Sequence, residues 1–320
     1  MASSTLSNSA PPLLLLEQVS KWYGPVLSLN QVTLELNAGI TGLVGPNGSG
    51  KSTLIKLATG LIAPSLGRVT VRGLDASDWR ARHSIGYCPD HDAFYEEMSG
   101  REFVRTMAKL NGFQSGDVTS RSEAVLQRVG MVDRADRKLR GYSKGMRQRI
   151  KLAQALLHDP ELLILDEPLS GIDPLGRQEM LALFHELAAQ GKCLLISSHE
   201  LEELEKLTNH VAILSRGRIA AVGTLQQIRD LLDDYPMSVR VVLDDPKALA
   251  RHLLDVDGVL GFDFDDSGSG LTIRARSPER FFASFQMLVL EKRIAVRELE
   301  PLDDSAHAIL GYLLGGSGKT

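Results

Sequence analysis

The first part of the chain alternates apolar and polar positions in short runs. Residues 13–19, 31–36 and 40–44 have the pattern of strands, and the third run leads directly into a glycine-rich turn. From residue 51 to about residue 59 the apolar positions recur with helical spacing, and the pattern stops near Gly60 and Pro64. This order predicts a strand, a loop and a helix in direct succession.

The middle of the chain, from about residue 96 to residue 140, has a helical pattern and is interpreted as an insertion. Ser99 and Glu102 form a capping box ahead of one apolar helical run, and a second helix is expected near residues 123–129. A longer amphipathic helix begins at Ser143 and ends before Pro160. Strand and helix then alternate to about residue 229, which is typical of an α/β fold with a buried sheet.

A second pattern follows a linker at residues 233–237. It predicts a strand at 239–243, a helix at 247–254, strands near 262–264 and 271–273, a helix around 281–288 and a strand near 294–296. The order βαββαβ is the signature of a ferredoxin-like α+β domain. We therefore predict a flexible tail (1–12), a main domain (13–231), a small α+β domain (237–302), and a terminal helix and tail (303–320).

Composition narrows the class of protein. With 43% hydrophobic residues in 320, the chain has enough apolar material for about two folded domains. The 36 basic residues against 40 acidic ones argue against a mainly electrostatic nucleic-acid binder. Two distant cysteines, Cys88 and Cys193, suggest neither a disulfide framework nor a zinc site, which favours a reducing, cytosolic setting. No apolar run approaches the roughly 18 residues of a membrane span, and the first 12 residues lack the features of a secretory signal.

The glycine-rich turn carries the most specific motif. It matches G-x-x-x-x-G-K-[ST] between a predicted strand and a predicted helix, a context that argues against a connector that binds nothing. Its glycines let backbone amides surround a polyphosphate, its lysine reaches the outer phosphates, and the hydroxyl after the lysine binds Mg²⁺. The predicted nucleotide-binding residues of this loop are Gly45, Pro46, Asn47, Gly48, Ser49, Gly50, Lys51, Ser52 and Thr53.

Two acids follow the apolar strand at residues 162–165. Asp166 at the end of a buried strand is placed to position Mg²⁺, and Glu167 to polarise a water molecule that attacks the terminal phosphate. Without the phosphate loop, a strand that simply ends in solvated acids would be an equally good interpretation. With the loop, the pair indicates phosphoryl transfer to water.

The start of the long amphipathic helix resembles a known family. The segment Tyr142-Ser143-Lys144-Gly145-Met146 resembles the signature sequence of the nucleotide-binding subunit of ABC transporters, usually Leu-Ser-Gly-Gly-Gln. Ser143 and Gly145 match that sequence, whereas Lys144 and Met146 depart from it. In that family the loop meets the γ-phosphate of ATP held by the opposing subunit, which implies the same contact here. Alone, the motif would fit a plain helix cap.

Other positions match the family in the right order. Tyr23 resembles the aromatic residue that stacks on adenine, Asp173 lies in a segment resembling the loop that communicates across the dimer, and His199 resembles the switch histidine that contacts the γ-phosphate. Each alone would fit packing or hydrogen bonding. Together they imply a P-loop NTPase of the ABC cassette type, with a RecA-like core, an antiparallel β subdomain and a helical insertion.

One position departs from the family in a way that concerns the metal. Where most relatives have a glutamine, this sequence has Asp90. A carboxylate is also an oxygen ligand for Mg²⁺, so the predicted metal residues are Ser52, Asp90 and Asp166. The additional negative charge is expected to shift the coupling between metal binding and movement of the insertion.

The resemblance implies the ATP-hydrolysing subunit of an exporter-type ABC transporter, most similar to the ABCA group, using ATP and Mg²⁺. It further implies a dimer, expected to be a homodimer, bound to a separate multi-spanning membrane permease on the cytoplasmic face, with no nucleic acid. A soluble ABC-type ATPase of translation or DNA maintenance is the alternative, but the sequence shows neither a tandem cassette nor long heptads. Intact Glu167 and His199 argue against a scaffold that does not hydrolyse ATP. Whether the region after residue 237 regulates or supports the dimer, or is a passive appendage, stays open.

Overall fold

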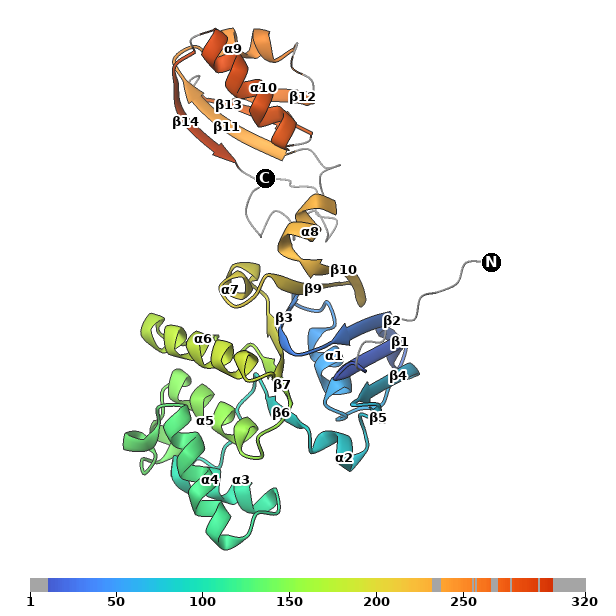
Figure 1. The fold of residues 1–320 in the computed structure, drawn as a ribbon, viewed down its shortest axis with the longest axis vertical. Coiled ribbons are helices and arrows are strands. Elements are labelled where there is room, and N and C mark those ends of the chain that lie inside the picture. Colours follow the sequence, from blue (N-terminus) through green and yellow to red (C-terminus); the bar gives the residue numbers. More distant parts are fainter. Residues whose placement is uncertain are drawn as a thin grey trace. The chain divides into compact units, whose positions relative to one another are not determined.

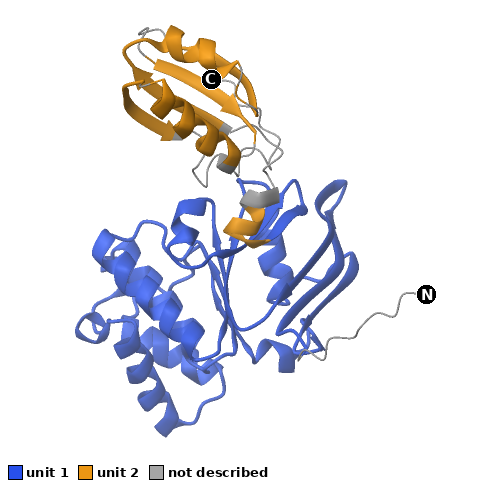
Figure 2. Cartoon of the chain, turned by 45° about the horizontal axis from the view of Figure 1, so that its top comes forward, with its two compact units in different colours: residues 1–222 blue, residues 223–320 orange. Residues whose placement is uncertain are grey.

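The computed structural model describes residues 11–231 and 237–301, apart from residues 255, 257, 266–269, 277 and 293. The chain divides into two compact units, residues 1–222 and 223–320 (Figure 2). This division falls inside strand β10 (Arg218–Thr224), ten residues before the predicted linker at 233–237. The domain limits given above stay predictions. Most of the predicted N-terminal tail, the predicted linker and the terminal helix lie outside the described residues.

A six-stranded sheet forms the centre of the first unit. Its strand order is β10-β9-β3-β8-β7-β6, and β6, β7, β8, β3 and β9 run parallel. All residues of β7 and β8 are buried, which explains their nearly continuous apolar sequence. The strands are β3 (Gly39–Val44), β6 (Ile85–Cys88), β7 (Leu162–Asp166), β8 (Cys193–Ser198), β9 (His210–Ser215) and β10 (Arg218–Thr224).

A second, antiparallel sheet has the order β2-β1-β4-β5. It consists of β1 (Leu14–Tyr23), β2 (Val26–Leu36), β4 (Leu66–Val71) and β5 (Leu74–Asp75), with the short helix α2 (Trp79–Arg82) after it. Helix α1 (Lys51–Ala58) lies between the two sheets (Figure 1), and one apolar cluster includes buried residues of both sheets and of α1, such as Leu34, Leu54 and Leu195. Packing of both sheets on the same helix fixes the loop that precedes it.

The helical insertion comprises α3 (Gly100–Leu110), α4 (Ser115–Arg128) and two 3₁₀ turns, Val132–Arg134 and Leu139–Gly141. These helices lie beside α5 (Lys144–Leu156), the helix that follows the signature-like segment (Figure 1). The predicted capping box is confirmed: the Glu102 amide donates to Ser99 Oγ at 3.2 Å, and the Ser99 amide donates to Glu102 Oε2 at 2.8 Å. After β7 and β8 come α6 (Pro174–Ala189) and α7 (Leu201–Glu205).

The second unit confirms the predicted ferredoxin-like order. After α8 (Leu225–Leu231) come β11 (Met237–Leu243), α9 (Pro246–Leu253), β12 (Val259–Phe264), β13 (Gly270–Ala275), α10 (Pro278–Glu291) and β14 (Val296–Pro301). Its sheet is antiparallel in the order β12-β13-β11-β14. Val241, Ile273 and Phe281 are fully buried in its core. Across both units, the described helices include none with the length and apolar character of a membrane span.

Candidate nucleotide-binding site

Adjacent parallel strands bring the predicted site residues to one edge of the six-stranded sheet. The register pairs Val44 of β3 with Ser198 of β8, and Asp166 of β7 with Ser197 of β8. Because these strands run in the same direction, the segments that follow them leave the sheet side by side. The phosphate loop, the acidic pair and the segment carrying Asp90 after β6 therefore converge.

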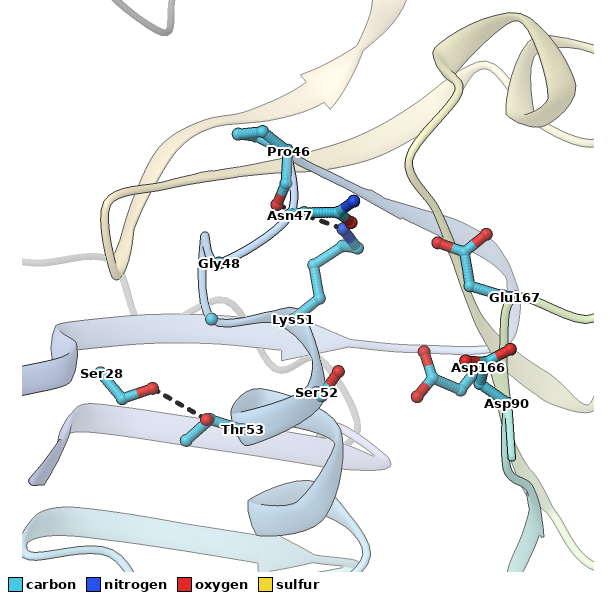
Figure 3. Close-up of a pocket in the computed structure, with 11 residues that line it drawn as sticks. Ser28, Pro46, Asn47, Gly48, Lys51, Ser52, Thr53, Asp90, Asp166 and Glu167 are labelled. Carbon is cyan, nitrogen blue, oxygen red and sulfur yellow. Dashed lines mark hydrogen bonds between the residues drawn. The ribbon is translucent and has the colours of Figure 1, made fainter. Parts of the chain in front are cut away.

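These segments line a pocket of about 260 Å³ (Figure 3). Nearly all of its lining residues belong to the set predicted from the sequence; the exception is Ser28 of β2, whose hydroxyl lies 2.8 Å from Thr53 Oγ1. The predicted residues in the lining are Pro46, Asn47, Gly48, Gly50, Lys51, Ser52, Thr53, Asp90, Asp166 and Glu167. Gly45 and Ser49 belong to the same loop without lining the pocket. The structure thus gathers the phosphate loop and three of the four predicted acids, Asp90, Asp166 and Glu167, around one space.

The phosphate loop requires glycine for two different reasons. Gly48 and Gly50 have φ angles of +79° and +111°, a backbone region that other residues rarely adopt. At Gly45 a Cβ atom would lie 2.3 Å from the carbonyl oxygen of Leu214 in β9. Gly50 is the N-cap residue of α1 and has no side chain to occupy the first free amides of the helix. Those amides and the helix dipole make this position suitable for an anion.

Lys51 provides the positive charge of the pocket. Its Nζ donates to the carbonyl oxygens of Gly45 at 2.5 Å and Pro46 at 3.4 Å, so the loop itself holds the side chain. Burial lowers the pKa of Lys51, an effect that the carboxylates of Glu167 and Asp166 oppose. Phosphate oxygens are acceptors of the same kind as these carbonyls, and the loop therefore fits a polyphosphate group.

The donor set opposite Lys51 fits Mg²⁺. Figure 3 shows the Ser52 hydroxyl and the carboxylates of Asp90 and Asp166 facing the same part of the pocket. Burial raises the pKa of Asp166, and a hydrogen bond of 2.6 Å from Ser197 Oγ opposes the rise. Within the described part of the chain, no group of three His, Cys, Asp or Glu side chains is arranged to hold a metal by itself. Hard oxygen donors from Ser52 and from phosphate would complete the coordination, which is how Mg²⁺ is usually held at nucleotides.

Glu167 stands at the edge of the pocket in an unusual backbone conformation. Its φ is +49°, in the left-handed region, and its amide donates to Ser197 Oγ at 3.0 Å. Its Oε2 lies 3.0 Å from Nδ1 of His199, whose side chain is half-exposed. Burial raises the pKa of Glu167, and His199 opposes the rise. A carboxylate with a raised pKa, oriented by a histidine, has the properties of a general base.

Besides Gly45, Ser49 and His199, which adjoin the lining residues, four predicted site residues lie outside the lining of this pocket. Tyr23 ends β1, about half-exposed, with Lys21 Nζ 5.6 Å from the centre of its ring. Ser143 is exposed and caps α5 by accepting from the Met146 amide at 3.3 Å, and Gly145 follows in the first turn of α5. Asp173 is the exposed N-cap residue of α6. None of the four lines the pocket, and their roles stay predictions.

Ser197 is a site residue that the sequence did not single out. Its buried hydroxyl donates to Asp166 and accepts from the amide of Glu167, so one side chain connects both acids. The sequence signal is weak, because a serine near the end of an apolar strand most often only packs. Only the register of β7 and β8 shows that its hydroxyl meets the acids.

Replacing Ser197 with Ala is expected to destabilise the protein by about 1–3 kcal/mol, because a buried carboxylate loses its donor. The pKa of Asp166 is expected to rise further, and ATP turnover to fall. Urea unfolding and steady-state phosphate release measure the two effects. Ser198→Ala is the matched control: it removes a buried hydroxyl that donates to Glu203 Oε2 at 3.0 Å. Equal loss of turnover in both variants would contradict the role given to Ser197.

Comparison with known proteins agrees with this geometry. The family model of the ABC transporter matches residues 29–170. The chain is 41% identical over 213 residues to an uncharacterized ABC transporter ATP-binding protein of a Nostoc strain, and the match covers 66% of this chain and 64% of that relative. It is 36% identical over 215 residues to the linearmycin resistance ATP-binding protein of Bacillus subtilis, covering 66% and 69%. A solved structure of an ATP-binding subunit of an ABC transporter has a TM-score of 0.63 and 32% identity, covering 69% of this chain and 93% of that one.

The fold and the pocket define a P-loop nucleotide-binding protein. The chain belongs to the ABC transporter family, as an ATP-binding subunit. The resemblance seen in the sequence is confirmed, and so is the expected α/β cassette. The chain spans about two thirds of the length of the Nostoc relative.

Proposed function

We propose that this subunit binds ATP with Mg²⁺ and hydrolyses it to ADP and phosphate to power an exporter-type ABC transporter. The observation that carries the proposal is the single pocket in which Lys51, Asp166 and Glu167 face one another. A lysine and free helix amides suit a polyphosphate, and an adjacent acid with a raised pKa suits proton transfer from water.

Each residue has a distinct part in the proposed reaction. Lys51 and the amides at the start of α1 hold the phosphates. Ser52, Asp90 and Asp166 would hold Mg²⁺, which when bound would supply positive charge to the phosphate oxygens. Water adds to the γ-phosphorus as the bond to the β–γ bridging oxygen breaks. Glu167 accepts the proton of that water, and His199 keeps the carboxylate in place through the 3.0 Å contact.

A second subunit completes the proposed site. Ser143, Gly145 and Asp173 lie outside the pocket of their own chain. In the proposed dimer they meet the nucleotide held by a second copy, so ATP joins the halves and hydrolysis releases them. The free N-terminal amides of α5, next to the exposed Ser143, suit that contact with an anion.

The proposed partner is a multi-spanning membrane permease on the cytoplasmic face of the membrane, with no nucleic acid involved. Support comes from the name of the Bacillus subtilis relative, which associates that protein with linearmycin resistance. Export is the simplest way in which an ATP-binding transporter subunit gives resistance, and we extend that direction of transport to this chain.

The test is co-purification from detergent-solubilised native membranes. Tagged Glu167→Gln protein with ATP and Mg²⁺ is expected to recover a multi-spanning membrane protein, identified by mass spectrometry. Lys51→Ala protein, which lacks the phosphate-binding ammonium, is the control. Adding ATP is expected to increase its recovery of the membrane protein much less than it does for Glu167→Gln. Recovery of ribosomes or other soluble partners alone would contradict the transport function and support the soluble alternative.

A further inference from the structure

A polar bridge joins α5 to the segment that carries Asp90. Lys151 Nζ donates to the main-chain oxygen of Asp90 at 2.7 Å and forms an ion pair with Asp92 Oδ1 at 3.1 Å. One turn earlier on α5, Arg147 donates to both carboxylate oxygens of Glu96, at 2.7 and 2.8 Å. Residues 90–96 are therefore attached to α5 at two points, one at Lys151 and one at Arg147.

Lys151 is unusual because its charge is buried. Its side chain is only 4% exposed, and its neighbours on the buried side of α5 include Ile150 and Leu152. A buried ammonium is costly unless it is paired and hydrogen-bonded. The contacts of Lys151 to Asp90 and Asp92 are thus the specific reason for a lysine here.

The buried positive charge of Lys151 has a specific partner in the segment that carries Asp90. The Asp90 carboxylate lines the pocket with Asp166 and Glu167. Three carboxylates that line one pocket repel one another when all are charged, and Asp90 adds one negative charge to Asp166 and Glu167. An acid at position 90 therefore needs both a fixed main chain and a nearby positive charge, and Lys151 supplies both at the carbonyl of the same residue.

We propose that Lys151 is a positioning residue for Asp90, and that the two residues form a matched pair that sets the contribution of Mg²⁺ to nucleotide binding. This inference rests on the proposed function of the pocket. Lys151 holds the main chain of Asp90 so that its carboxylate faces the pocket, and its ammonium, paired with Asp92, places positive charge beside the segment that carries the acid. With glutamine at position 90, the requirement for Lys151 disappears.

The experiment is a double-mutant cycle on the full chain, read out by nucleotide binding. The dissociation constant of a fluorescent ATP analogue is measured with Mg²⁺ and with EDTA, and the ratio of the two constants gives the contribution of Mg²⁺. Lys151→Met is expected to reduce this ratio about tenfold when Asp90 is present, a coupling of the size found between contacting residues. In the Asp90→Gln background, the same Lys151→Met change is expected to leave the ratio unchanged.

A matched lysine elsewhere in the sheet controls for lost stability. Lys192, which precedes β8, is 11% exposed, pairs with Asp159 Oδ1 at 2.6 Å and donates to the Pro160 carbonyl at 2.8 Å. It has the same kind of partners as Lys151 but lies at the opposite end of β8 from the pocket. Lys192→Met is expected to lower the melting temperature without changing the Mg²⁺ ratio.

Each outcome of the cycle either supports or overturns the pairing of Lys151 with Asp90. An unchanged ratio in Lys151→Met, an equal loss in both backgrounds, or the same loss in Lys192→Met would overturn it. If Lys151→Met does not fold, Lys151→Gln takes its place in the same cycle, because it removes the ammonium that binds the Asp90 carbonyl and Asp92 but keeps a polar side chain. Failure of the unaltered protein to bind the analogue would overturn the proposed function as well, whereas normal binding with an additive cycle overturns only the pairing of Lys151 with Asp90.

Discussion

Replacing Glu167 with Gln is expected to lower ATP turnover by about 10²- to 10⁴-fold, the usual contribution of a general base. The amide has the same size as the carboxylate but cannot accept a proton from water. It can still meet His199, and the Ser197 hydroxyl still accepts from the main chain of residue 167, so the local backbone is expected to persist. Phosphate release and ATP titration measure turnover and affinity separately, and the affinity should stay within a few-fold of the original.

An acid at the other end of the same strand controls for this change. Glu161 precedes β7 and forms an exposed ion pair with Arg72. Glu161→Gln is expected to leave turnover unaltered. If Glu167→Gln retained full turnover, or lost ATP affinity as strongly as turnover, the assignment of Glu167 as the base would be wrong.

Local signals explain why much of the site could be predicted from the sequence. The phosphate loop follows an apolar strand and precedes a helical pattern. Gly48 and Gly50 are needed because the loop's own backbone has positive φ angles at these positions. Ser99 and Glu102 are three residues apart, so their capping box is fixed within one turn. The ferredoxin-like order likewise follows from the succession of short periodic segments.

The rest depended on contacts between segments far apart in the chain. Ser197 matters because β8 pairs with β7 in a register that places it beside Asp166, and a strand pattern alone does not give register. Lys151 looks like one more polar residue of an amphipathic helix until its contact with Asp90, 61 positions earlier, is known. The left-handed backbone of Glu167 has no local sequence signal, because surrounding contacts rather than its own preference hold it there.

Gly45→Ala is expected to have a large effect on both stability and ATP binding, because the added methyl group clashes with the backbone. The added Cβ would lie 2.3 Å from the Leu214 carbonyl oxygen and 2.7 Å from Ser49 Oγ. The carbonyl belongs to β9, next to Ile213, which pairs with Val44 of β3, so the backbone there has little freedom to move. Overpacking of this kind costs about 1–3 kcal/mol or more. Because the carbonyl of Gly45 also holds Lys51, displacing the loop is expected to remove detectable ATP binding.

A glycine in open space separates this clash from the general effect of adding a methyl group. Gly116 lies in α4, and a Cβ atom there would meet no described neighbour within 4 Å. Gly116→Ala is expected to be neutral or to stabilise by up to about 1 kcal/mol, because alanine favours helix. Urea unfolding without nucleotide and ATP titration compare the two variants. A Gly45→Ala protein as stable as Gly116→Ala, with normal ATP affinity, would mean that the loop tolerates displacement from β9 and that the steric clash does not explain the glycine at position 45.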